Sequence, residues 1–381
     1  MQQSPKRILI FSWEFLPFHG GIATYCAEMA QAAAEAGNQV TVVCPDYHQD
    51  NSSEDSKKPY KVHRFPGLHY STKQLPRIMF EALKINPDDY DIIHAAEWSA
   101  VVGMHLIRPL KKLPFIATVH GTDIFGYDTS RVLRTLKATD TLKHAKYIVT
   151  NSDFTARLTK DYHPYIDPQK VRPTLLGVNP WWFETAKDTN DLRNRYDIAP
   201  DKKIILTVAR LDERKGHRTV LKALALLPQE DKNKLVYVIV GKYGSDEYVA
   251  ELKNLAEACG VRVLFAGGID IEDVRSFYKT SWLFCMPGEF HPKRIEGFGL
   301  AYLEAAAQKL PALATPIGGV PEVVVNGQTG TLINDVTPEK LALEISDLLK
   351  NPEKVSAMGE KAYEWAQKFT WSRCVGQAYD D

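Results

Sequence analysis

The feature that most constrains the fold is a regular alternation of short apolar runs, rich in Val and Ile, with longer helical stretches. Residues 7–12 form the first apolar run, and residues 22–36 form the first helical stretch, which ends at Gly37. Short apolar runs that alternate with helices are typical of βαβ units, whose parallel sheet is buried on both faces. The sequence therefore predicts an α/β protein built on parallel sheets.

The alternation occurs twice along the 381 residues, and Pro180 with its two following Trp residues interrupts it between residues 179 and 200. The expected strands are 7–12, 39–44, 91–94, 115–120, 147–150 and 171–176, then 204–209, 235–240, 262–266, 282–286 and 312–315. The expected helices are 22–36, 96–110, 131–145 and 153–162, then 216–227, 246–259, 272–279, 298–308, 338–350, 352–369 and 371–379. Two doubly wound halves predict a ligand cleft at the carboxyl ends of their strands.

Composition excludes several classes of protein. The 47 basic residues balance 47 acidic ones, so the net charge gives no reason to expect a nucleic-acid partner. No run reaches the roughly 18 apolar residues that a membrane span needs, and residues 8–11 are too short a run for a signal peptide. The five cysteines are scattered and odd in number, which indicates reduced thiols without a disulfide framework or a zinc site. We therefore expect a cytoplasmic protein.

Two loops in the first half carry candidate binding groups. Gly20 and Gly21 follow the first strand, where backbone amides and a helix N-terminus can approach an anion, although a Gly pair is also an ordinary tight turn. Their spacing does not match the G-x-G-x-x-G dinucleotide motif. His120 ends a predicted strand and is followed by Asp123. It can donate to a sugar hydroxyl or to charge on a leaving group, or the two residues simply cap local backbone.

The loop after residues 204–209 carries two cations, Arg210 and Lys215, on either side of a turn that opens onto a helix. An Arg fork and a compact Lys charge can converge on one phosphate-bearing group. The alternative is a solvated charge cluster with the acidic neighbours Asp212 and Glu213. The position of the loop at a strand end favours the phosphate.

The most specific motif is a pair of glutamates, Glu296 and Glu304, that flanks a Gly-x-Gly turn at the start of a predicted helix. The amides of Phe298, Gly299 and Leu300 would be unpaired donors of the first turn, available to a diphosphate. Carboxylates accept hydrogen bonds from vicinal hydroxyls but repel phosphate, so each Glu should lie beside the diphosphate. As structure alone, Glu304 is a helix-face residue and Glu296 a loop charge.

Together these motifs resemble glycosyltransferase family 4, which comprises retaining enzymes of the GT-B fold. Glu296 and Glu304 match the E-x7-E motif of that family. Further matching segments stand in the family's order: Gly20-Gly21, His120 to Asp123, Arg210 to Gly216, Gly318 to Glu322, and Phe369 to Trp371. The resemblance covers nearly the whole chain and is strongest from about residue 204 to residue 333.

The resemblance implies two Rossmann-like doubly wound domains that face a central cleft. An acceptor-binding domain would span residues 1–185, completed by a C-terminal helix at about 368–381 that crosses back to it. A domain that binds the nucleotide-sugar donor would span residues 200–367. Two segments depart from the family pattern: 241–244 is one residue longer, and 308–311 lacks a Gly. The loop 288–295 is less typical; its charged side chains, which could tune donor or acceptor choice, are Glu289, His291, Lys293 and Arg294.

The resemblance also implies a role for each candidate residue. Arg210 and Lys215 would neutralise the leaving diphosphate. Glu296 would hold the transferred sugar and Glu304 the ribose. His120 would lie over the sugar near the reacting centre. The loop of Gly20 and Gly21 would approach phosphate and acceptor, and the strand end at Gly268 would lie near the base.

The function expected from this resemblance is retaining transfer of a hexose from a nucleotide-diphosphate sugar. UDP-glucose and GDP-mannose are the expected donors, and the acceptor is a hydroxyl of a sugar, a glycan or a lipid-linked compound. No residue clearly provides a carboxylate nucleophile, so we expect same-face substitution, stabilised by the fixed cations and helix amides without cofactor or metal. The alternatives are a nucleotide-sugar epimerase of the same fold and a non-catalytic nucleotide-sugar binding protein.

Charge is uneven in the first half. Between residues 57 and 84 only Glu81 is acidic, whereas the basic residues there are Lys57, Lys58, Lys61, Arg64, Lys73, Arg77 and Lys84. Helical segments further along add Arg108, Lys111, Lys112, Arg131, Arg134, Lys137, Lys143 and Lys146. A basic amphipathic surface suits peripheral contact with the anionic inner face of a membrane, or it is a solvated helix face.

Overall fold

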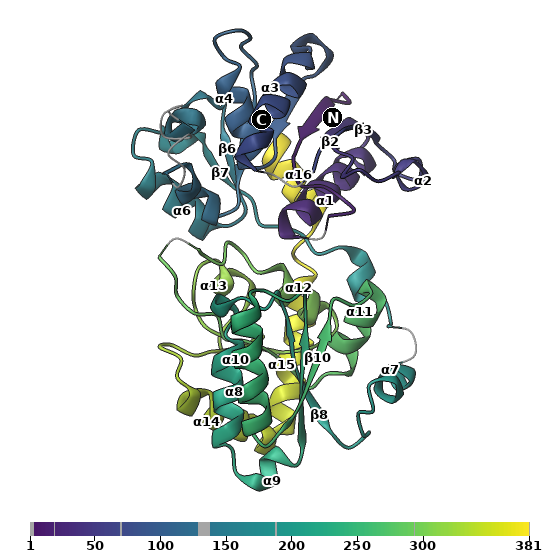
Figure 1. Ribbon diagram of the computed structural model, residues 1–381, viewed down its shortest axis with the longest axis vertical. Coiled ribbons are helices and arrows are strands. Elements are labelled where there is room, and N and C mark those ends of the chain that lie inside the picture. The colour runs from purple at the N-terminus through teal and green to yellow at the C-terminus, as the bar shows by residue number, and fades with distance from the viewer. Residues whose placement is uncertain are drawn as a thin grey trace. The chain divides into compact units, whose positions relative to one another are not determined.

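The computed structural model describes residues 4–18, 20–68, 71–128, 138–186, 189–292 and 294–380. The chain divides into two compact units. Unit 1 comprises Met1–Gly177 together with Thr370–Asp381, and unit 2 comprises Val178–Phe369. Each unit is a parallel sheet flanked by helices, as the sequence pattern predicts (Figure 1). The short Val- and Ile-rich runs form the strands because their side chains are buried on both faces of the sheet.

Unit 1 contains a seven-stranded sheet in the order β3-β2-β1-β4-β5-β6-β7, and its strand pairs are parallel. The strands are β1 (Arg7–Phe11), β2 (Gln39–Pro45), β3 (Lys61–Phe65), β4 (Ile92–Ala95), β5 (Ile116–Val119), β6 (Ile148–Thr150) and β7 (Val171–Pro173). The strand order reverses direction between β1 and β4. Loops that follow these two strands therefore lie at the switch point, where doubly wound sheets bind ligands.

Among the described residues of unit 1, the α-helices are α1 (Gly21–Glu35), α2 (Ser52–Asp55), α3 (Leu75–Lys84), α4 (Trp98–Leu106), α6 (Asp153–Tyr162) and α16 (Trp371–Tyr379). The last of these comes from the end of the sequence and packs against α1. Its N-cap is Thr370, whose hydroxyl accepts a hydrogen bond from the amide of Arg373. The rings of Tyr25 and Trp371 lie 6.2 Å apart where the two helices meet.

Unit 2 contains a six-stranded parallel sheet in the order β10-β9-β8-β11-β12-β13. The strands are β8 (Lys203–Val208), β9 (Leu235–Val240), β10 (Arg262–Gly267), β11 (Leu283–Met286), β12 (Ala312–Ala314) and β13 (Gly330–Leu332). Here the order reverses between β8 and β11. The loops after these two strands are the ones in which the sequence analysis finds Lys215 and Glu296.

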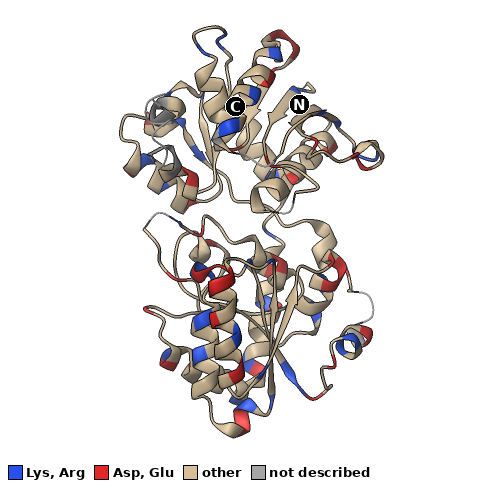
Figure 2. Cartoon of the chain, viewed as in Figure 1, with Lys and Arg blue, Asp and Glu red and all other residues tan. Residues whose placement is uncertain are grey.

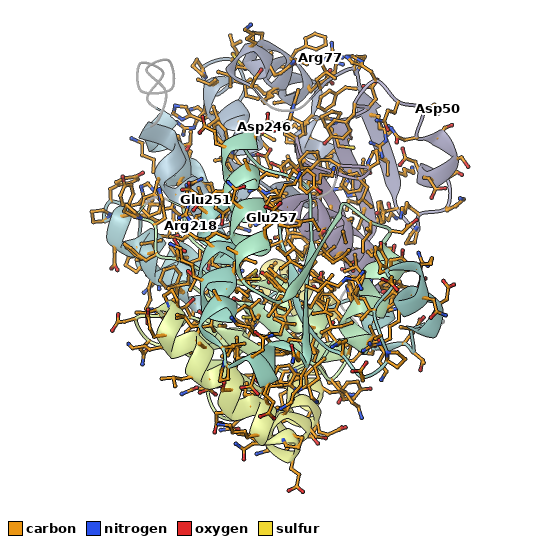
Figure 3. All side chains as sticks on the ribbon, turned by 60° about the horizontal axis from the view of Figure 1, so that its bottom comes forward. Asp50, Arg77, Arg218, Asp246, Glu251 and Glu257 are labelled. Atoms are coloured by element: carbon orange, nitrogen blue, oxygen red, sulfur yellow. The ribbon has the colours of Figure 1, made fainter. Side chains whose placement is uncertain are left out.

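In the described part of unit 2, the α-helices are α7 (Thr189–Arg195), α8 (His217–Leu226), α9 (Gln229–Lys232), α10 (Asp246–Ala258), α11 (Ile271–Thr280), α12 (Leu300–Ala307), α13 (Val320–Val323), α14 (Pro338–Lys350) and α15 (Pro352–Ala366). The charged residues of α8 are basic, whereas those of α10 are mostly acidic (Figure 2). Arg218 of α8 and Glu251 of α10 form a two-pronged ion pair, with nitrogen–oxygen distances of 2.6 and 2.7 Å (Figure 3). This ion pair links the two helices and contributes to their packing.

The sequence pattern misses some elements and misjudges one. Strand β3 was not predicted, because an edge strand with alternating polar residues carries a weak apolar signal. Helix α3 and the three-residue strand β13 were also missed. The helix predicted over residues 131–145 is wrong over its second part, because Ala138–His144 forms a 3-10 helix. The remainder of that prediction, residues 131–137, lies outside the described residues.

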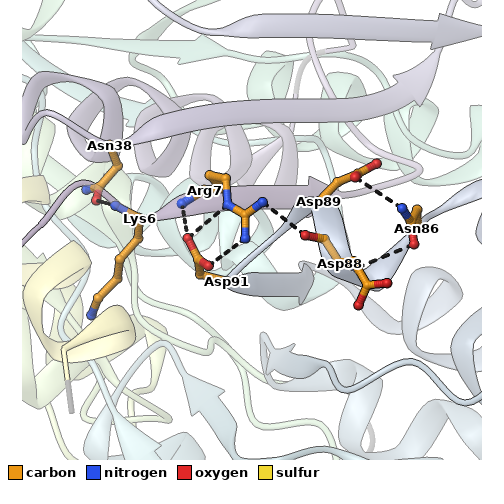
Figure 4. A network of polar contacts seen from close by, with 7 residues as sticks. All are labelled: Lys6, Arg7, Asn38, Asn86, Asp88, Asp89 and Asp91. Carbon is orange, nitrogen blue, oxygen red and sulfur yellow. Dashed lines mark hydrogen bonds and ion pairs between the residues drawn. The ribbon is translucent and has the colours of Figure 1, made fainter.

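The acidic pair Asp88-Asp89 lies in a turn. Pro87–Asp89 forms one 3-10 turn, which Asn86 caps by accepting a hydrogen bond from the amide of Asp88. Next to this turn, the guanidinium of Arg7 binds the carboxylate of Asp91 at 2.9 Å and the carbonyl of Asp88 at 2.9 Å (Figure 4). This network joins the amino ends of β1 and β4, at the edge of the sheet opposite to the switch-point loops.

Two further expectations concern thiols and membrane spans. All five cysteines are free thiols with buried side chains. In the part of the chain that the structure describes, none of the helices is both long enough and apolar enough to cross a bilayer.

Candidate active site

The best-defined part of the candidate site lies at the switch point of unit 2. Three loops meet there, which follow β8, β11 and β12. Gly216, in the first loop, has a φ of 77°, and a Cβ on it would come within 2.1 Å of the carbonyl oxygen of Pro287 in the second loop. The amide of Glu289 also donates to the carbonyl of Arg214 at 2.8 Å. The backbones of the first two loops are therefore in direct contact, which only Gly permits at this position.

Lys215 and Glu296 form an ion pair across these loops. The Nζ atom of Lys215 lies 2.6 Å from Oε2 of Glu296. The two side chains are 17% and 19% exposed, so both charges are partly shielded from water but still accessible. Two residues far apart in the sequence are thus brought together as a cation beside a carboxylate, an arrangement that can bind an anionic group and its neighbouring hydroxyls at once.

The third loop, which follows β12, contacts the backbone of Glu296. Gly318 has a φ of 59°, and a Cβ there would lie 1.9 Å from the carbonyl oxygen of Glu296. The amide of Gly319 donates to that same oxygen at 3.0 Å. The Gly pair therefore fixes the backbone that carries the Glu296 side chain. Sequence reasoning noted this pair only as part of the family resemblance and gave it no role.

The first turn of α12 presents unpaired donors beside the ion pair. Gly299 has a φ of 103° and precedes the helix. Among the described residues, the amides of Phe298, Gly299 and Leu300 have no acceptor within the protein. The first amides of a helix lack partners inside the helix, and the helix dipole adds positive potential there. This turn is suited to an anion, as the sequence predicts.

Glu304 lies further along α12, half-buried. Its Oε2 atom accepts a hydrogen bond at 3.2 Å from the hydroxyl of Tyr278 on α11. Tyr278 itself is fully buried, and burial, followed by the charge of Glu304, raises the pKa of its phenol well above the ordinary value. The phenol therefore stays neutral and acts as the donor. Sequence reasoning missed Tyr278, because a Tyr on the inner face of a helix has the pattern of any core residue.

Arg210 is not part of the Lys215–Glu296 pair. Its side chain is exposed and makes no ion pair with the described residues. Asp212 stands among three cations: Arg214 lies at 3.3 Å and Arg294 at 3.6 Å, and Arg210 adds a longer-range charge. Burial acts to raise the pKa of Asp212, but the amide of Arg214 and these charges outweigh it and lower that pKa. Part of this loop is thus the charge cluster that the sequence left open as the alternative.

The remaining groups of unit 2 lie at neighbouring strand ends. Gly268 follows β10, and a Cβ on it would meet only the side chain of Lys242, at 3.5 Å. In the loop after β11, Glu289 accepts a hydrogen bond from Thr219 at 3.0 Å, and the ring of Phe290 is 81% exposed. Lys293, expected to contribute to this loop, lies outside the described residues.

In unit 1, His120 lies at the carboxyl end of β5, next to the switch point. Its backbone amide donates to both carboxylate oxygens of Asp123 at 2.9 Å, and the amide of Gly121 donates to the same carboxylate at 2.7 Å. Burial raises the pKa of Asp123, and His120 and these amides act in the opposite direction. Asp123 therefore caps the local backbone, as the alternative interpretation of this motif held, and so fixes the loop that carries His120.

The ring of His120 is oriented by one hydrogen bond. Its Nε2 atom lies 2.9 Å from the carbonyl oxygen of Ala96, at the end of β4. A carbonyl only accepts hydrogen bonds, so Nε2 must carry the proton, and Nδ1 of the neutral ring is left as an acceptor. Neutral His120 therefore has no second N–H with which to donate to a substrate. The predicted donor role would require the imidazolium form.

A buried polar chain lies behind His120. The ring of Tyr25 packs against the imidazole with centroids 4.9 Å apart and planes at 79°. The hydroxyl of Tyr25 is 3.0 Å from that of Thr118, which is 2.6 Å from Nε2 of His94. Nδ1 of His94 is 2.8 Å from the hydroxyl of Tyr379 on α16. Burial lowers the pKa of His94 to about 3, so its ring is neutral. No pattern in the sequence points to these partners.

The Gly pair of unit 1 lies at the start of α1. Gly20 is the N-cap in extended conformation, and a Cβ on it would lie 3.1 Å from the ring of Phe18. A Cβ on Gly21 would meet nothing within 4 Å, so open space adjoins the helix N-terminus. Beside this loop, the carboxylate of Glu97 accepts the amide of Trp13 at 3.1 Å, which joins the loops after β1 and β4. His19 lies outside the described residues.

Comparison with known protein families decides the assignment. Residues 19–181 match the family model Glycosyltransferase Family 4, and residues 188–365 match Glycosyl transferases group 1. The chain belongs to glycosyltransferase family 4. This confirms the resemblance found in the sequence, and with it the enzyme class: a hexosyltransferase of a retaining family that uses nucleotide-sugar donors.

Relatives and solved structures match this glycosyltransferase along most of its length. A GDP-mannose-dependent alpha-(1-6)-phosphatidylinositol monomannoside mannosyltransferase of Mycolicibacterium smegmatis is 26% identical over 376 residues, which cover 94% of this chain and 93% of the relative. A D-inositol 3-phosphate glycosyltransferase of Corynebacterium aurimucosum is 26% identical over 383 residues, covering 94% and 89%. The crystal structure of Anabaena HepE with UDP and glucose has a TM-score of 0.78 at 18% identity and covers 98% of both chains. The likeness confirms the GT-B fold.

Proposed function

We propose that this glycosyltransferase transfers a hexose of the glucose or mannose type, with retention, from UDP-glucose or GDP-mannose to a hydroxyl of a sugar, glycan or lipid-linked acceptor. The observation that carries the proposal is the pair of Lys215 and Glu296, 2.6 Å apart beside the unpaired amides of α12. A sugar diphosphate requires this combination: positive groups for the phosphates and a carboxylate for the sugar hydroxyls. Two similar proteins support these candidates. The relative from Mycolicibacterium smegmatis is named as GDP-mannose-dependent, and HepE also has a crystal structure in complex with UDP-glucose.

The roles of the donor-side residues follow from their chemistry. Lys215 and the amides of Phe298, Gly299 and Leu300 would bind the leaving diphosphate, and exposed Arg210 would add a second cation when the donor is bound. Glu296 would accept hydrogen bonds from the transferred sugar, and Glu304 from the ribose. Gly268, with no side chain, would leave room for the base. The leaving phosphate itself would accept the acceptor proton, so the protein contributes mainly electrostatic stabilisation.

On the acceptor side, His120 would act through Nδ1. Because Nε2 is bound to Ala96, a neutral His120 would accept a hydrogen bond from a sugar hydroxyl and not donate one. Gly20 and Gly21 would let phosphate or acceptor approach the N-terminus of α1 closely. We assign acceptor binding to unit 1 and donor binding to unit 2.

We expect transfer from one of the two donors to proceed at an undiminished rate in the presence of EDTA, because Lys215 and the helix amides would supply the positive charge that a divalent ion provides elsewhere. The measurement is a thermal-shift panel with UDP, GDP, ADP and NAD, followed by product analysis with each sugar form of the nucleotide that binds. A nucleotide at a hundred times its Kd should add about 2.7 kcal/mol of stability. Stabilisation by NAD alone would contradict the proposal, and an acceptor-independent change of the sugar would indicate an epimerase.

We also propose that unit 1 contacts anionic membranes through the end of α3 and the loop after α4. Two apolar residues are exposed there: Phe80 has 51% of its surface exposed, and Leu110 has 76%. Arg77 and Lys84 flank the ring of Phe80, although both also pair with Glu81. Exposed apolar side chains between cations favour an anionic lipid surface. Arg131, Arg134 and Lys137 of the predicted basic surface lie outside the described residues.

Sedimentation with lipid vesicles tests the proposed membrane contact. The protein should sediment with vesicles that contain anionic lipid and not with purely zwitterionic ones, and Phe80→Ser with Leu110→Ser should abolish the sedimentation. Leu343→Ser, at a residue of α14 that is 71% exposed, is the matched control. Equal sedimentation of the double variant and the wild type would exclude this surface.

A further inference from the structure

The carboxylate of Glu304 is half-buried, and its neighbour Tyr278 is held in a more rigid environment than the carboxylate is. Tyr278 is fully buried, on the inner face of α11, and its hydroxyl donates to Oε2 of Glu304 at 3.2 Å. A buried phenol needs an acceptor, and this carboxylate supplies it. The contact connects the core of unit 2 to a carboxylate at the candidate nucleotide site.

Aromatic neighbours hold the ring of Tyr278 on two sides. The ring of Trp182 lies 5.6 Å away at 75°, and that of Phe284, in β11, lies 5.8 Å away at 59°. Trp182 is fixed in turn, because the side-chain amide of Gln308 donates to its carbonyl oxygen. The phenol is therefore a donor with a defined location, not one that follows the carboxylate.

The segment around Trp182 is itself bound firmly to unit 2. Arg275 is 1% exposed, and its guanidinium lies 3.9 Å above the ring of Trp181 and donates to the Trp181 carbonyl at 2.8 Å. Gln308 also donates to the carbonyl of Glu184 at 2.9 Å. The support behind Tyr278 thus extends through a layer of buried polar contacts within the unit.

We propose that Tyr278 is a positioning residue for the nucleotide: its hydroxyl orients the Glu304 carboxylate toward the ribose, and so strengthens the selection of ribonucleotide over deoxyribonucleotide donors. The inference rests on the proposed function of Glu304. A glutamate side chain loses rotational freedom when it binds a diol, and a fixed donor reduces that loss before the ligand arrives. The phenol does not touch the nucleotide.

The test compares the affinity of the nucleotide that binds, UDP or GDP, with that of its 2′-deoxy and 3′-deoxy counterparts by calorimetry. Glu304→Ala should bring the ratio of ribo to deoxy affinity close to one. Tyr278→Phe keeps the ring and its packing and removes only the hydroxyl. The distance of 3.2 Å is long for an O–H···O bond, so we expect a loss of about three- to tenfold in ribonucleotide affinity. The affinity for the deoxy analogues and kcat should stay unchanged.

A control variant keeps the result interpretable. Tyr237→Phe is the matched control, because Tyr237 is a fully buried residue of the same unit whose hydroxyl lies 2.9 Å from that of Thr207. Its ratio of ribo to deoxy affinity should equal that of the wild type.

The outcomes separate the two proposals. An unchanged ratio in Glu304→Ala would overturn the ribose role of Glu304 and with it this inference. A collapsed ratio in Glu304→Ala together with a wild-type ratio in Tyr278→Phe would overturn the role of Tyr278 alone. Equal losses for ribo and deoxy nucleotides in Tyr278→Phe would show a packing effect and would also overturn it.

Discussion

Glu296→Gln and Lys215→Met should each lower kcat/KM for sugar transfer by at least about a hundredfold while the protein stays folded. The two side chains form one partly shielded ion pair at 2.6 Å. Removal of Lys215 would take away the fixed cation nearest to the leaving diphosphate, whose negative charge would then be less stabilised. Removal of the Glu296 charge would weaken the hydrogen bonds that the transferred sugar donates. Steady-state kinetics with the identified donor, together with the thermal midpoint of each variant, measures both effects.

Glu251→Gln provides the matched control for this prediction. Glu251 belongs to unit 2, carries the same substitution and accepts from Arg218 at the same distance of 2.6 Å, but lies between α8 and α10. Its variant should transfer sugar at nearly the wild-type rate. Full activity in Glu296→Gln or Lys215→Met would refute the candidate site, and equal losses in the control would show that the assay reports stability.

Deletion of the residues after Phe369 should unfold unit 1. The helix that would be lost, α16, buries Trp371, Cys374, Val375, Ala378 and Tyr379. Apolar burial contributes about 25 cal/mol per Å², so such a face accounts for several kcal/mol, a large share of the usual stability of a domain. The deletion would also leave the fully buried ring of His94 without the hydroxyl of Tyr379. Hydrogen exchange resolved along the chain would show loss of protection in β1 to β7.

A milder variant checks the reason for that loss. Tyr379→Phe keeps the packing of α16 and removes only the hydrogen bond to His94, so it should cost about 1–3 kcal/mol of unfolding free energy. Unit 2 should keep its protection in both variants, because its residues run continuously from Val178 to Phe369. Wild-type stability of unit 1 after the deletion would contradict the prediction.

Much of the site could be predicted from the sequence, because its residues stand where apolar runs end. Lys215 and Glu296 follow strands that the pattern identifies, and parallel strands bring their carboxyl ends to one edge of the sheet. The pattern does not state which strands are neighbours. Only the order β9-β8-β11 shows that these two loops meet at a switch point.

The residues that the sequence analysis missed share one property: their polar role depends on partners that are distant along the chain. His94 lies in a strand that reads as core, and its partners are Thr118 and Tyr379. Tyr278 appears as one more apolar position on a helix until Glu304 is seen beside it. The proton on Nε2 of His120 likewise depends on the Ala96 carbonyl, and no residue pattern encodes that contact.

The return of the chain to unit 1 has a consequence for synthesis of the protein. Domains usually fold in order as they leave the ribosome, the N-terminal one first. Here the first unit to be translated lacks α16 until after residue 369, whereas the second unit has its whole sequence by then. We expect the second unit to reach its native state on the ribosome while the first still exposes the face of α1 that α16 will cover. Tyr25 and His94, which are buried in the folded protein, are exposed to solvent during that interval. A chaperone would then find the largest exposed apolar surface to bind.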